Sequence, residues 1–374
     1  MPPIHVMIKP AGGLCNMRCR YCFYADEMDN RQLQSCGSIM EPAVLEAVIR
    51  RTLAHAEGQA TIAFQGGEPT LAGLDFFRLV VELEKKHNTR HIQIDNALQT
   101  NGYVIDEEWA KFLAENHFLV GLSLDGPKDL HDLNRLDAAG KGTYSKVMHA
   151  VQLLKNHHVE FNTLTVVTRS ASRSFRKIYG FFDRNDLPWQ QYIPCLDPLG
   201  QERGGEAYSL RPEDFTRYLK DAFDCWYRDV STGKFRYHRY FTNLVAMLRG
   251  QPPEACGMMG VCGMQYVVEA DGSVYPCDFY CLDQWKLGNF LTVDFDALDA
   301  KREELGFIRL SAQHHPDCLE CPWRYLCRGG CRRDREEIPG QDTPGKNYYC
   351  ESYKEFFAYA APRLEHLARG GYRC

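Results

Sequence analysis

Three cysteines lie close together near the N-terminus, in a pattern that can hold an iron-sulfur cluster. Cys15, Cys19 and Cys22 form a Cys-X3-Cys-X2-Cys triplet. A fully ligated 4Fe-4S cluster takes four cysteine thiolates, so three thiolates leave one iron open to a ligand from outside the protein. A catalytic cluster requires such an open iron, and an electron-carrying cluster does not. The alternatives are a zinc site whose fourth ligand lies elsewhere in the chain, or three unrelated buried thiols.

Eight more cysteines group by their spacing in the C-terminal third of the chain. Cys262, Gly272 and Cys277 follow the pattern Cys-X9-Gly-X4-Cys, and a later run follows Cys-X2-Cys-X5-Cys-X3-Cys. Eight thiolates suffice for two four-cysteine sites. Spacing alone does not distinguish zinc from iron and sulfide, and the order along the chain leaves open which cysteines share a site. The eight are Cys256, Cys262, Cys277, Cys318, Cys321, Cys327, Cys331 and Cys350.

The composition narrows the class of protein. Of the 374 residues 44% are hydrophobic and 25% charged, as in an ordinary folded protein, and the net charge of −5 gives no general attraction for nucleic acid or anionic membranes. We expect neither partner. No signal peptide and no long apolar segment is found in the sequence, so we expect a cytoplasmic protein. Sixteen cysteines there cannot rest as ordinary disulfides, which favours metal or redox chemistry.

Strands and helices alternate in the first half of the sequence and must position the triplet. Short apolar runs predict strands at 4–8, 60–64, 92–98, 118–124, 161–167 and 189–193. Helical spacing of apolar residues predicts helices at 42–56, 74–87, 107–115, 144–156 and 174–185. This alternation indicates an α/β fold with a parallel sheet and right-handed crossovers. Working residues of such folds gather at the carboxyl ends of the strands.

The texture of the sequence changes in the second half. Residues 200–250 look helical, a hairpin is predicted around Asp271-Gly272, and a last helix is predicted at 351–367. We therefore expect two domains, residues 1–235 and residues 236–374, the second rich in cysteine. The five cysteines outside the groups are expected to be free thiols, and they are Cys36, Cys195, Cys225, Cys281 and Cys374.

The triplet and the strand ends together resemble the radical S-adenosylmethionine superfamily. That resemblance implies a partial (β/α)6 TIM-like barrel in which the open iron is chelated by S-adenosylmethionine, whose cleavage yields a deoxyadenosyl radical. It also implies that the glycines of Gly66-Gly67-Glu68-Pro69 approach the methionine group of the cofactor, and that Tyr21 sits against the cluster. Ser123 and Arg135 match positions that hold the ribose and carboxylate, and Leu196 matches an adenine contact.

The second cysteine pattern resembles the SPASM domain of radical enzymes that act on peptides. The resemblance implies two auxiliary 4Fe-4S clusters and hence three clusters in all. In the pattern of that family, one auxiliary cluster is held by Cys256, Cys262, Cys277 and Cys331, and the other by Cys318, Cys321, Cys327 and Cys350.

Nearly the whole chain resembles the anaerobic sulfatase-maturating enzymes, most clearly in residues 14–24, 64–70, 121–127 and 271–280. The resemblance implies oxidation of one cysteine or serine in a Cys/Ser-X-Pro-X-Arg segment of a sulfatase to Cα-formylglycine. Asp278 matches the acceptor of the substrate proton, beside Cys277 of the cluster that takes the electron. Tyr24 and Gln65 resemble substrate-facing residues. A flavodoxin or ferredoxin is the expected reductant.

Three other readings stay open at this point. A different SPASM enzyme would form thioether or carbon-carbon crosslinks in a small peptide, although such enzymes often carry an N-terminal leader-binding domain and the triplet here begins at residue 15. A pure iron-sulfur electron carrier would need no glycine-rich cradle and no open iron. A zinc-stabilised interaction module would be colourless.

Overall fold

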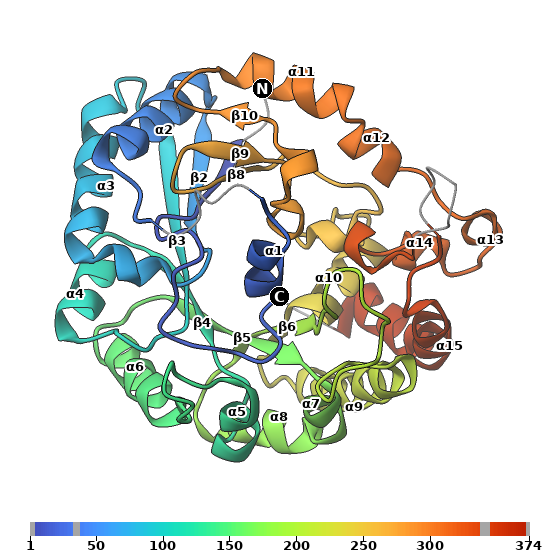
Figure 1. Cartoon of the computed structure of the whole chain (residues 1–374). Helices are drawn as coiled ribbons and strands as arrows, with labels where there is room; N and C mark the ends of the chain where they lie inside the picture. The colour runs from blue at the N-terminus through green and yellow to red at the C-terminus, as the bar shows by residue number, and fades with distance from the viewer. Residues whose placement is uncertain (1–3, 33–37, 337–344, 372–374) are drawn as a thin grey trace. The chain divides into compact units, whose positions relative to one another are not determined.

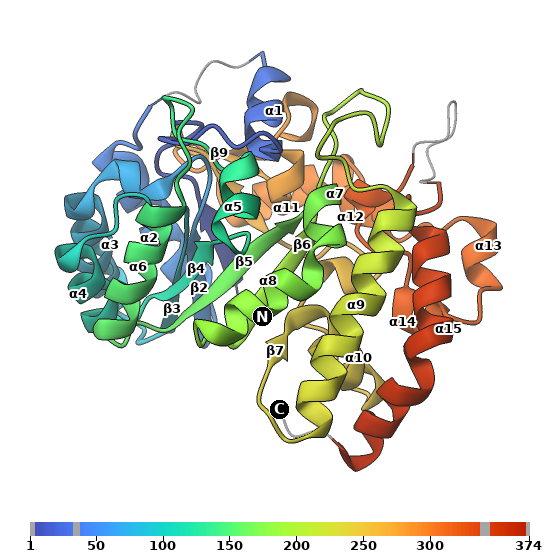
Figure 2. The same cartoon turned by 90° about the horizontal axis from the view of Figure 1, so that it is seen from below.

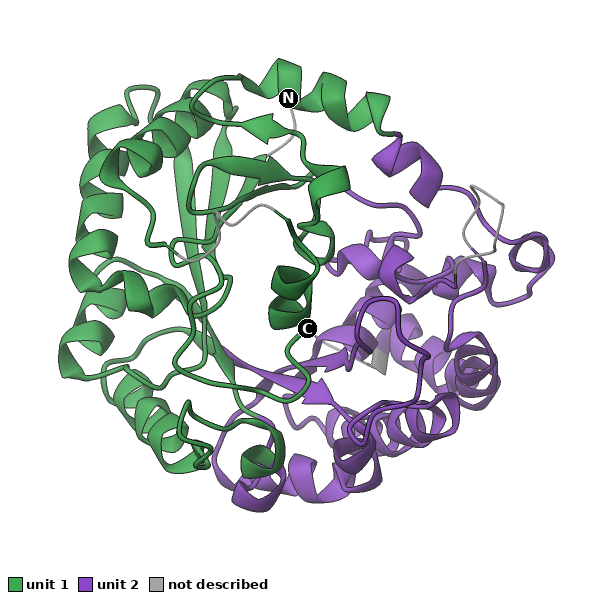
Figure 3. Ribbon diagram, in the orientation of Figure 1, with its two compact units in different colours: residues 1–124, 131–161, 264–305 green, residues 125–130, 162–263, 306–374 purple. Residues whose placement is uncertain are grey.

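The computed structural model describes residues 4–32, 38–336 and 345–371. The chain divides into two compact units (Figure 3). Unit 1 consists of Met1–Leu124, His131–Phe161 and Met264–Leu305, and unit 2 consists of Asp125–Leu130, Asn162–Gly263 and Gly306–Cys374. Each unit thus combines segments from both halves of the sequence.

Parallel strands form the centre of unit 1. β1 (Ile4–Ile8), β2 (Gln59–Phe64), β3 (Gln93–Thr100) and β4 (Leu119–Ser123) pair in this order, all parallel. β8 (Tyr266–Val268) adds to the other side of β1, also parallel. β9 (Ser273–Tyr275) and β10 (Gly288–Asn289) then continue the sheet with antiparallel pairing. The C-terminal hairpin is therefore part of the same sheet as the N-terminal strands.

Helices connect the parallel strands of unit 1, and α2, α3 and α4 lie outside them (Figure 1). Phe64 of β2 packs on Phe77 of α3 with ring centroids 5.0 Å apart, and Phe118 lies 6.2 Å from both rings. Burying these rings stabilises the packing of helix on sheet. The helices are α1 (Phe23–Asp29), α2 (Pro42–His55), α3 (Leu74–His87), α4 (Glu107–Glu115), α6 (Tyr144–Asn156) and α11 (Phe295–Glu304), with short 3-10 turns η2 (Pro69–Ala72), η4 (Asp278–Tyr280) and η5 (Asp283–Trp285).

Unit 2 continues the alternation of strands and helices and adds the cysteine-rich segments. β5 (Phe161–Val167), whose first residue belongs to unit 1, pairs in parallel with β6 (Trp189–Pro194), which pairs in parallel with β7 (Tyr237–His238). The long helices α9 (Pro212–Ser231), α10 (Arg239–Leu248) and α15 (Cys350–His366) pack together (Figure 2), with Phe356 5.7 Å from both Phe223 and Phe241. α5 (Lys128–Asn134) begins in unit 2 and ends in unit 1.

The remaining elements of unit 2 are short. They are α7 (Arg169–Arg173), α8 (Phe175–Arg184), η3 (Cys256–Met258), α12 (Phe307–Ser311), α13 (Pro316–Leu319), α14 (Arg324–Cys327), η6 (Arg332–Asp334) and η7 (Leu367–Gly371). Three of them, η3, α13 and α14, contain cysteines of the C-terminal groups.

The predicted α/β fold is confirmed, because six strands, β1 to β6, alternate with helices in the order of a partial (β/α)6 barrel and a cysteine-rich segment follows. Sequence periodicity missed α1, α5 and α11, and gave no sign that the predicted hairpin pairs with β1. The domain boundary after residue 235 stays a prediction. Among the described residues, no helix is both long and apolar enough to span a membrane.

Candidate active site

The cysteine triplet lies in the loop from β1 to α1 of unit 1, and its three residues are partly buried. Cys22 caps α1, with its Sγ accepting a hydrogen bond from the Ala25 amide at 3.4 Å. The Cys15 Sγ accepts from the Met17 amide, also at 3.4 Å. Burial raises the pKa of the Cys15 thiol to about 11, and Glu68 and Cys22 add to the rise. Iron binding displaces such a proton, because only the thiolate is a ligand.

Backbone hydrogen bonds hold this loop against the short segment that contains Arg135. The Arg18 amide donates to the Leu136 carbonyl at 2.7 Å, and the Arg20 amide donates to the Asn134 carbonyl at 3.0 Å. Between these partners lies Arg135, whose guanidinium is 5.5 Å from the centre of the Tyr21 ring. Both predicted cofactor contacts therefore lie directly beside the triplet.

The glycine pair fits against the other side of the loop. The Gly67 amide donates to the Gly12 carbonyl at 2.8 Å, and the following amide, that of Glu68, donates to the Leu14 carbonyl at 2.8 Å. Gly66 has φ of 124°, in the region that favours glycine. A Cβ on Gly67 would lie 2.2 Å from the Leu14 oxygen. Only glycine permits this close approach, so the pair shapes a cradle next to the cluster loop.

Glu68 braces the cradle from inside the protein. Its side chain is buried, and one carboxylate oxygen accepts from the hydroxyls of Thr70 at 2.6 Å and Thr100 at 2.7 Å. The other oxygen accepts from the Asn101 amide at 2.7 Å. The carboxylate thus ties the end of β2 to the end of β3.

Polar residues at two further strand ends complete the predicted set. At the end of β4, the Ser123 hydroxyl accepts from Gln99 Nε2 at 3.3 Å. Beyond β3, the Asn101 amide group lies 3.8 Å from the Cys15 Sγ and 2.8 Å from Asn16 Oδ1. Leu196 follows β6 and belongs to unit 2.

Asp278, the predicted base, is mostly buried at the start of η4 in unit 1, directly after Cys277. Lys9 Nζ lies 2.8 Å from its Oδ1, and Gln65 Nε2 donates to its Oδ2 at 2.6 Å. Lys9 and Gln65 stand at the carboxyl ends of β1 and β2. One ion pair, with Lys9, and one hydrogen bond, from Gln65, therefore hold the Asp278 carboxylate in one orientation.

The charged residues around Lys9 and Asp278 were not predicted from the sequence. Lys9 has no exposed surface, and its Nζ is 3.6 Å from the centre of the Tyr24 ring. Tyr24 donates its hydroxyl to Glu269 at 2.7 Å, and Arg31 donates to the same carboxylate at 2.9 Å. Burial lowers the pKa of Lys9, but Asp278 and further anionic groups outweigh it and raise the pKa well above its usual value. A lysine at the end of an apolar strand was the one available signal.

Four of the later cysteines line one enclosed cavity in unit 2, where they meet aromatic side chains. The cavity is lined by Cys318, Cys321, Cys327 and Cys350 together with Trp323, Tyr353 and Phe357, among others. Burial raises the pKa of the Cys327 thiol to about 11, and the other three thiols add to the rise. Four thiols around one largely apolar cavity fit an iron-sulfur cluster.

Three more cysteines approach one another elsewhere in unit 2. A Cβ on Gly257 would lie 3.4 Å from the Cβ of Cys331, which places η3 beside Cys331. Burial is the largest cause that raises the pKa of the Cys331 thiol. Asp334 and the thiols of Cys256 and Cys262 raise this pKa further. Cys277, which the resemblance joins to these three, belongs to unit 1.

Cys195, Cys225 and Cys281 are buried free thiols, and Cys36 and Cys374 lie outside the described residues. In the described ranges, no three cysteine, histidine or carboxylate side chains surround a point at the distances of a single metal ion.

Comparison with known proteins agrees with the geometry. Residues 10–181 match the radical SAM superfamily. The chain is 50% identical over 368 residues to the cysteine-type anaerobic sulfatase-maturating enzyme of Clostridium perfringens strain 13, covering 98% of this chain and 99% of the relative. It is 45% identical to the cysteine-type enzyme of Clostridium novyi over 99% of this chain and 98% of the relative. Identity to the serine-type enzyme of Bacteroides thetaiotaomicron is 31%, over 98% of this chain and 92% of the relative.

Solved structures give the same result. The structure described as native anSMEcpe with bound AdoMet and Kp18Cys peptide superposes with a TM-score of 0.93 at 49% identity, covering 98% of this chain and 99% of that chain. Streptococcus suis SuiB bound to S-adenosylmethionine, at 17% identity and a TM-score of 0.63 over 93% of this chain and 77% of that chain, shares the fold. This chain belongs to the anaerobic sulfatase-maturating enzymes of the radical SAM superfamily.

Proposed function

We propose that this chain oxidises a cysteine of a Cys-X-Pro-X-Arg segment in a sulfatase polypeptide to Cα-formylglycine, with the serine segment as a second substrate. The fixed Asp278 carboxylate carries the proposal, because it lies beside Cys277 in the unit that also contains the triplet. Cysteine is the preferred residue since the relatives at 45% to 50% identity are named cysteine-type, and those at 28% to 31% serine-type.

The cofactors are S-adenosylmethionine and three 4Fe-4S clusters. When bound, they supply a deoxyadenosyl radical that removes a hydrogen atom from the substrate Cβ, and an acceptor for the electron that the substrate then loses. Cys15, Cys19 and Cys22 hold the first cluster. The two sets of four cysteines that hold the auxiliary clusters are those implied by the family pattern. The cavity lined by four cysteines supports one of these sets.

The residues near the triplet bind and orient S-adenosylmethionine in this proposal. The carbonyl-lined cradle of Gly66 and Gly67 admits its methionine group, and Arg135, stacked over Tyr21, offers a cation for its carboxylate. Ser123 contacts the ribose and Leu196 the adenine.

Asp278 accepts the proton of the substrate thiol. Lys9 and Gln65 fix both of its oxygens, so its reacting lone pair is aimed before substrate binds. Gln65 is partly exposed and faces the substrate, together with Tyr24, whose hydroxyl is held by Glu269. Loss of one proton and one electron from the substrate radical yields a thioaldehyde, which water converts to the aldehyde.

The setting of the reaction is part of the same proposal. The enzyme works in the cytoplasm under anaerobic conditions, where thiols stay reduced, and a flavodoxin or ferredoxin supplies the electron that starts each turnover. The radical SAM barrel comprises residues 1–235 and the SPASM domain residues 236–374.

The direct test is an anaerobic assay of the reconstituted enzyme with S-adenosylmethionine, dithionite and a Cys-X-Pro-X-Arg peptide of about 18 residues, long enough to bury its reacting side chain. Mass spectrometry should detect the mass loss of a thiol-to-aldehyde conversion together with deoxyadenosine. If deoxyadenosine forms and the peptide is unchanged, the enzyme acts on a different peptide. If neither product forms, the chain is an electron carrier and not a radical SAM enzyme.

A variant tests the role of Asp278. Asp278→Asn should still cleave S-adenosylmethionine, while the yield of aldehyde falls about 100-fold or more because the base is missing. Asp296→Asn, an exposed carboxylate of α11 in the same unit, is the matched control and should keep full yield. Normal aldehyde yield from Asp278→Asn would remove this residue from the mechanism.

A further inference from the structure

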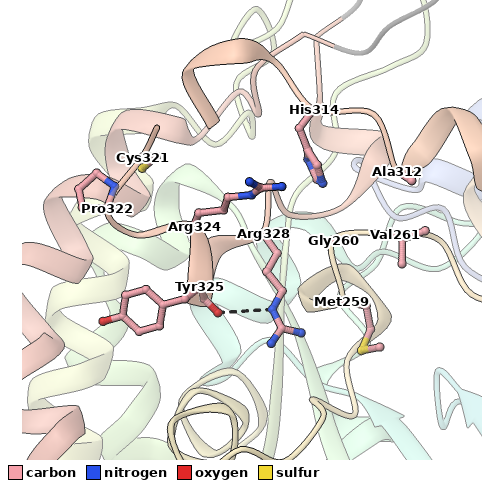
Figure 4. Close-up of a pocket in the computed structure, with 10 residues that line it drawn as sticks. All are labelled: Met259, Gly260, Val261, Ala312, His314, Cys321, Pro322, Arg324, Tyr325 and Arg328. Atoms are coloured by element: carbon pink, nitrogen blue, oxygen red, sulfur yellow. Dashed lines mark hydrogen bonds between the residues drawn. The ribbon is translucent and has the colours of Figure 1, made fainter. Parts of the chain in front are cut away.

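An open hollow of ≈ 600 Å³ lies on unit 2 beside α14 (Figure 4). The Arg324 guanidinium and the His314 ring point toward one another in this view, and Met259 lies on the opposite wall from Pro322. None of the functions assigned above uses this hollow. Its lining residues are Met259, Gly260, Val261, Ala312, His314, Cys321, Pro322, Arg324, Tyr325 and Arg328.

The hollow shares a wall with the cavity of four cysteines. Cys321 and Arg324 line both the open hollow and the enclosed cavity that also contains Cys318, Cys327 and Cys350. A molecule seated in the hollow would therefore be separated from a cluster in the cavity by about one side chain. Such proximity suits exchange of an electron.

The charge of the hollow differs from that of the chain. Its lining includes Arg324 and Arg328 and no aspartate or glutamate, and among the described residues no ion pair to a carboxylate is found for either arginine. The chain as a whole carries a net charge of −5. An acidic protein would thus be repelled by most of the surface and attracted here, which favours one orientation of docking.

The apolar residues of the hollow match the composition of protein interfaces. Tyr325 is 48% exposed and Met259 is 39% exposed. Arginine, tyrosine and methionine are enriched at the centres of interfaces, and lysine and glutamate, which are depleted there, are absent from this lining. Arg328 Nε donates to the backbone carbonyl of Tyr325 at 3.4 Å, which ties the Arg328 side chain to the main chain of α14.

We propose that this hollow docks an acidic one-electron carrier protein, a flavodoxin or ferredoxin, next to the cluster held by Cys318, Cys321, Cys327 and Cys350. The inference rests on the proposed function. For each substrate oxidised, one electron leaves the substrate radical and reduces the oxidised carrier by one electron, the thiol proton passes to Asp278, and no atom moves to the carrier.

The test measures binding of oxidised flavodoxin, and separately of ferredoxin, to the cluster-loaded enzyme by calorimetry at 25 to about 200 mM salt. At low salt we expect Arg328→Glu to weaken binding about tenfold, because reversing one charge at contact distance changes the attraction by that order. Arg217→Glu, an exposed arginine of α9 that lines neither cavity, should change binding less than twofold despite the same change in net charge. Binding to the unaltered enzyme should weaken as salt rises.

Two further measurements keep the outcomes separate. Arg328 has φ of 50°, which asparagine tolerates, so Arg328→Asn removes the charge with less risk to folding and should weaken binding in the same direction. Iron content and dithionite-driven formation of aldehyde should be unchanged in both Arg328 variants. Loss of dithionite activity in the unaltered enzyme would instead contradict the proposed function.

The docking proposal is overturned by either of two results. These are no binding of either carrier, or equal weakening of carrier binding by Arg328→Glu and Arg217→Glu.

Discussion

Replacing Lys9 with methionine tests whether the buried charges around Asp278 act as one set. Lys9 and Arg31 are the two cations, and they contact Asp278 and Glu269, with Lys9 Nζ 2.8 Å from Asp278 and 4.0 Å from Glu269. Burial raises the pKa of Glu27 to about 8, so this carboxyl is mostly protonated at neutral pH. Two cations therefore balance two carboxylates. Lys9→Met leaves one buried carboxylate without its partner.

The expected cost follows from this imbalance. Removing one partner of a buried ion pair typically costs about 3–5 kcal/mol. The Asp278 side chain keeps 12% of its surface exposed, so we expect the lower end of that range, about 3 kcal/mol. The double variant Lys9→Met with Asp278→Asn leaves no buried charge without a partner. The free energy of unfolding that it loses should therefore be smaller than the sum of the two single losses by about 1–3 kcal/mol.

The assay is anaerobic thermal unfolding of the single and double variants at equal iron content, followed by circular dichroism. For a chain of 374 residues, a cost of about 3 kcal/mol should lower the midpoint by roughly 4 °C. Lys85→Met, at an exposed lysine of α3, is the control and should shift the midpoint little. The reasoning is refuted if Lys9→Met behaves like this control, or if the two single effects are strictly additive.

Three further predictions concern the cradle, a cluster and a buried histidine. Gly67→Ala should weaken S-adenosylmethionine binding about tenfold or more by equilibrium dialysis, because the new methyl group would lie 2.2 Å from the Leu14 oxygen and displace the cradle. Cys327→Ser should lower the iron content by about four atoms per chain in a colorimetric assay. Burial lowers the pKa of His238 to about 3, so below its unfolded value of 6.5 only the unfolded chain takes up a proton. His238 should then contribute a fall of about 1.4 kcal/mol per pH unit to the free energy of unfolding as the pH drops below 6.5, and His238→Gln should lose this contribution in urea titrations.

Each of these has a control or a contrary outcome. Gly180→Ala adds a methyl group that meets only the flexible end of Arg184, and should leave cofactor binding unchanged. Cys225→Ser removes a buried free thiol and should keep the full iron content. Equal pH slopes for the unaltered chain and His238→Gln would mean that another group titrates between pH 6.5 and about 3.

Local patterns were enough to predict the regular part of the fold. β1 and β5 have the predicted bounds, as do α3, α4 and α6, because each is delimited by a clear change in apolar spacing. The strand ends also placed Gly67 and Ser123 at the edge where the triplet lies, since parallel strands present their carboxyl ends together. Spacing did not predict which four cysteines line one cavity, because the spaced run ends at Cys331 and the fourth thiol of the cavity is that of Cys350. Only the family resemblance had grouped Cys350 with the other three.

The charged network could not be read from the sequence, because its members are distant in the chain and meet only through tertiary pairing. Tyr24 and Glu269 are 245 positions apart, and Gln65 and Asp278 are 213 apart. A lone lysine such as Lys9 is usually a solvated side chain, and its burial is decided by neighbours that no local window contains. The short helix α1 was not predicted because its cap is Cys22, a residue type that is not an ordinary helix cap.

One strand pairing explains how the proposed base reaches its partner. β8 pairs with β1 in parallel, with Ile8 opposite Val268, and the Lys9 amide donates to the Val268 carbonyl at 2.8 Å. The hairpin that follows then returns through β9 and delivers Asp278 to Lys9. The same β1 leads directly into the triplet loop. A single strand therefore sets both the loop that carries the first cluster and the cation that orients the base, so the two groups share one rigid frame in unit 1. Changes that loosen the pairing of β8 with β1 should for this reason impair formation of aldehyde more than cleavage of S-adenosylmethionine.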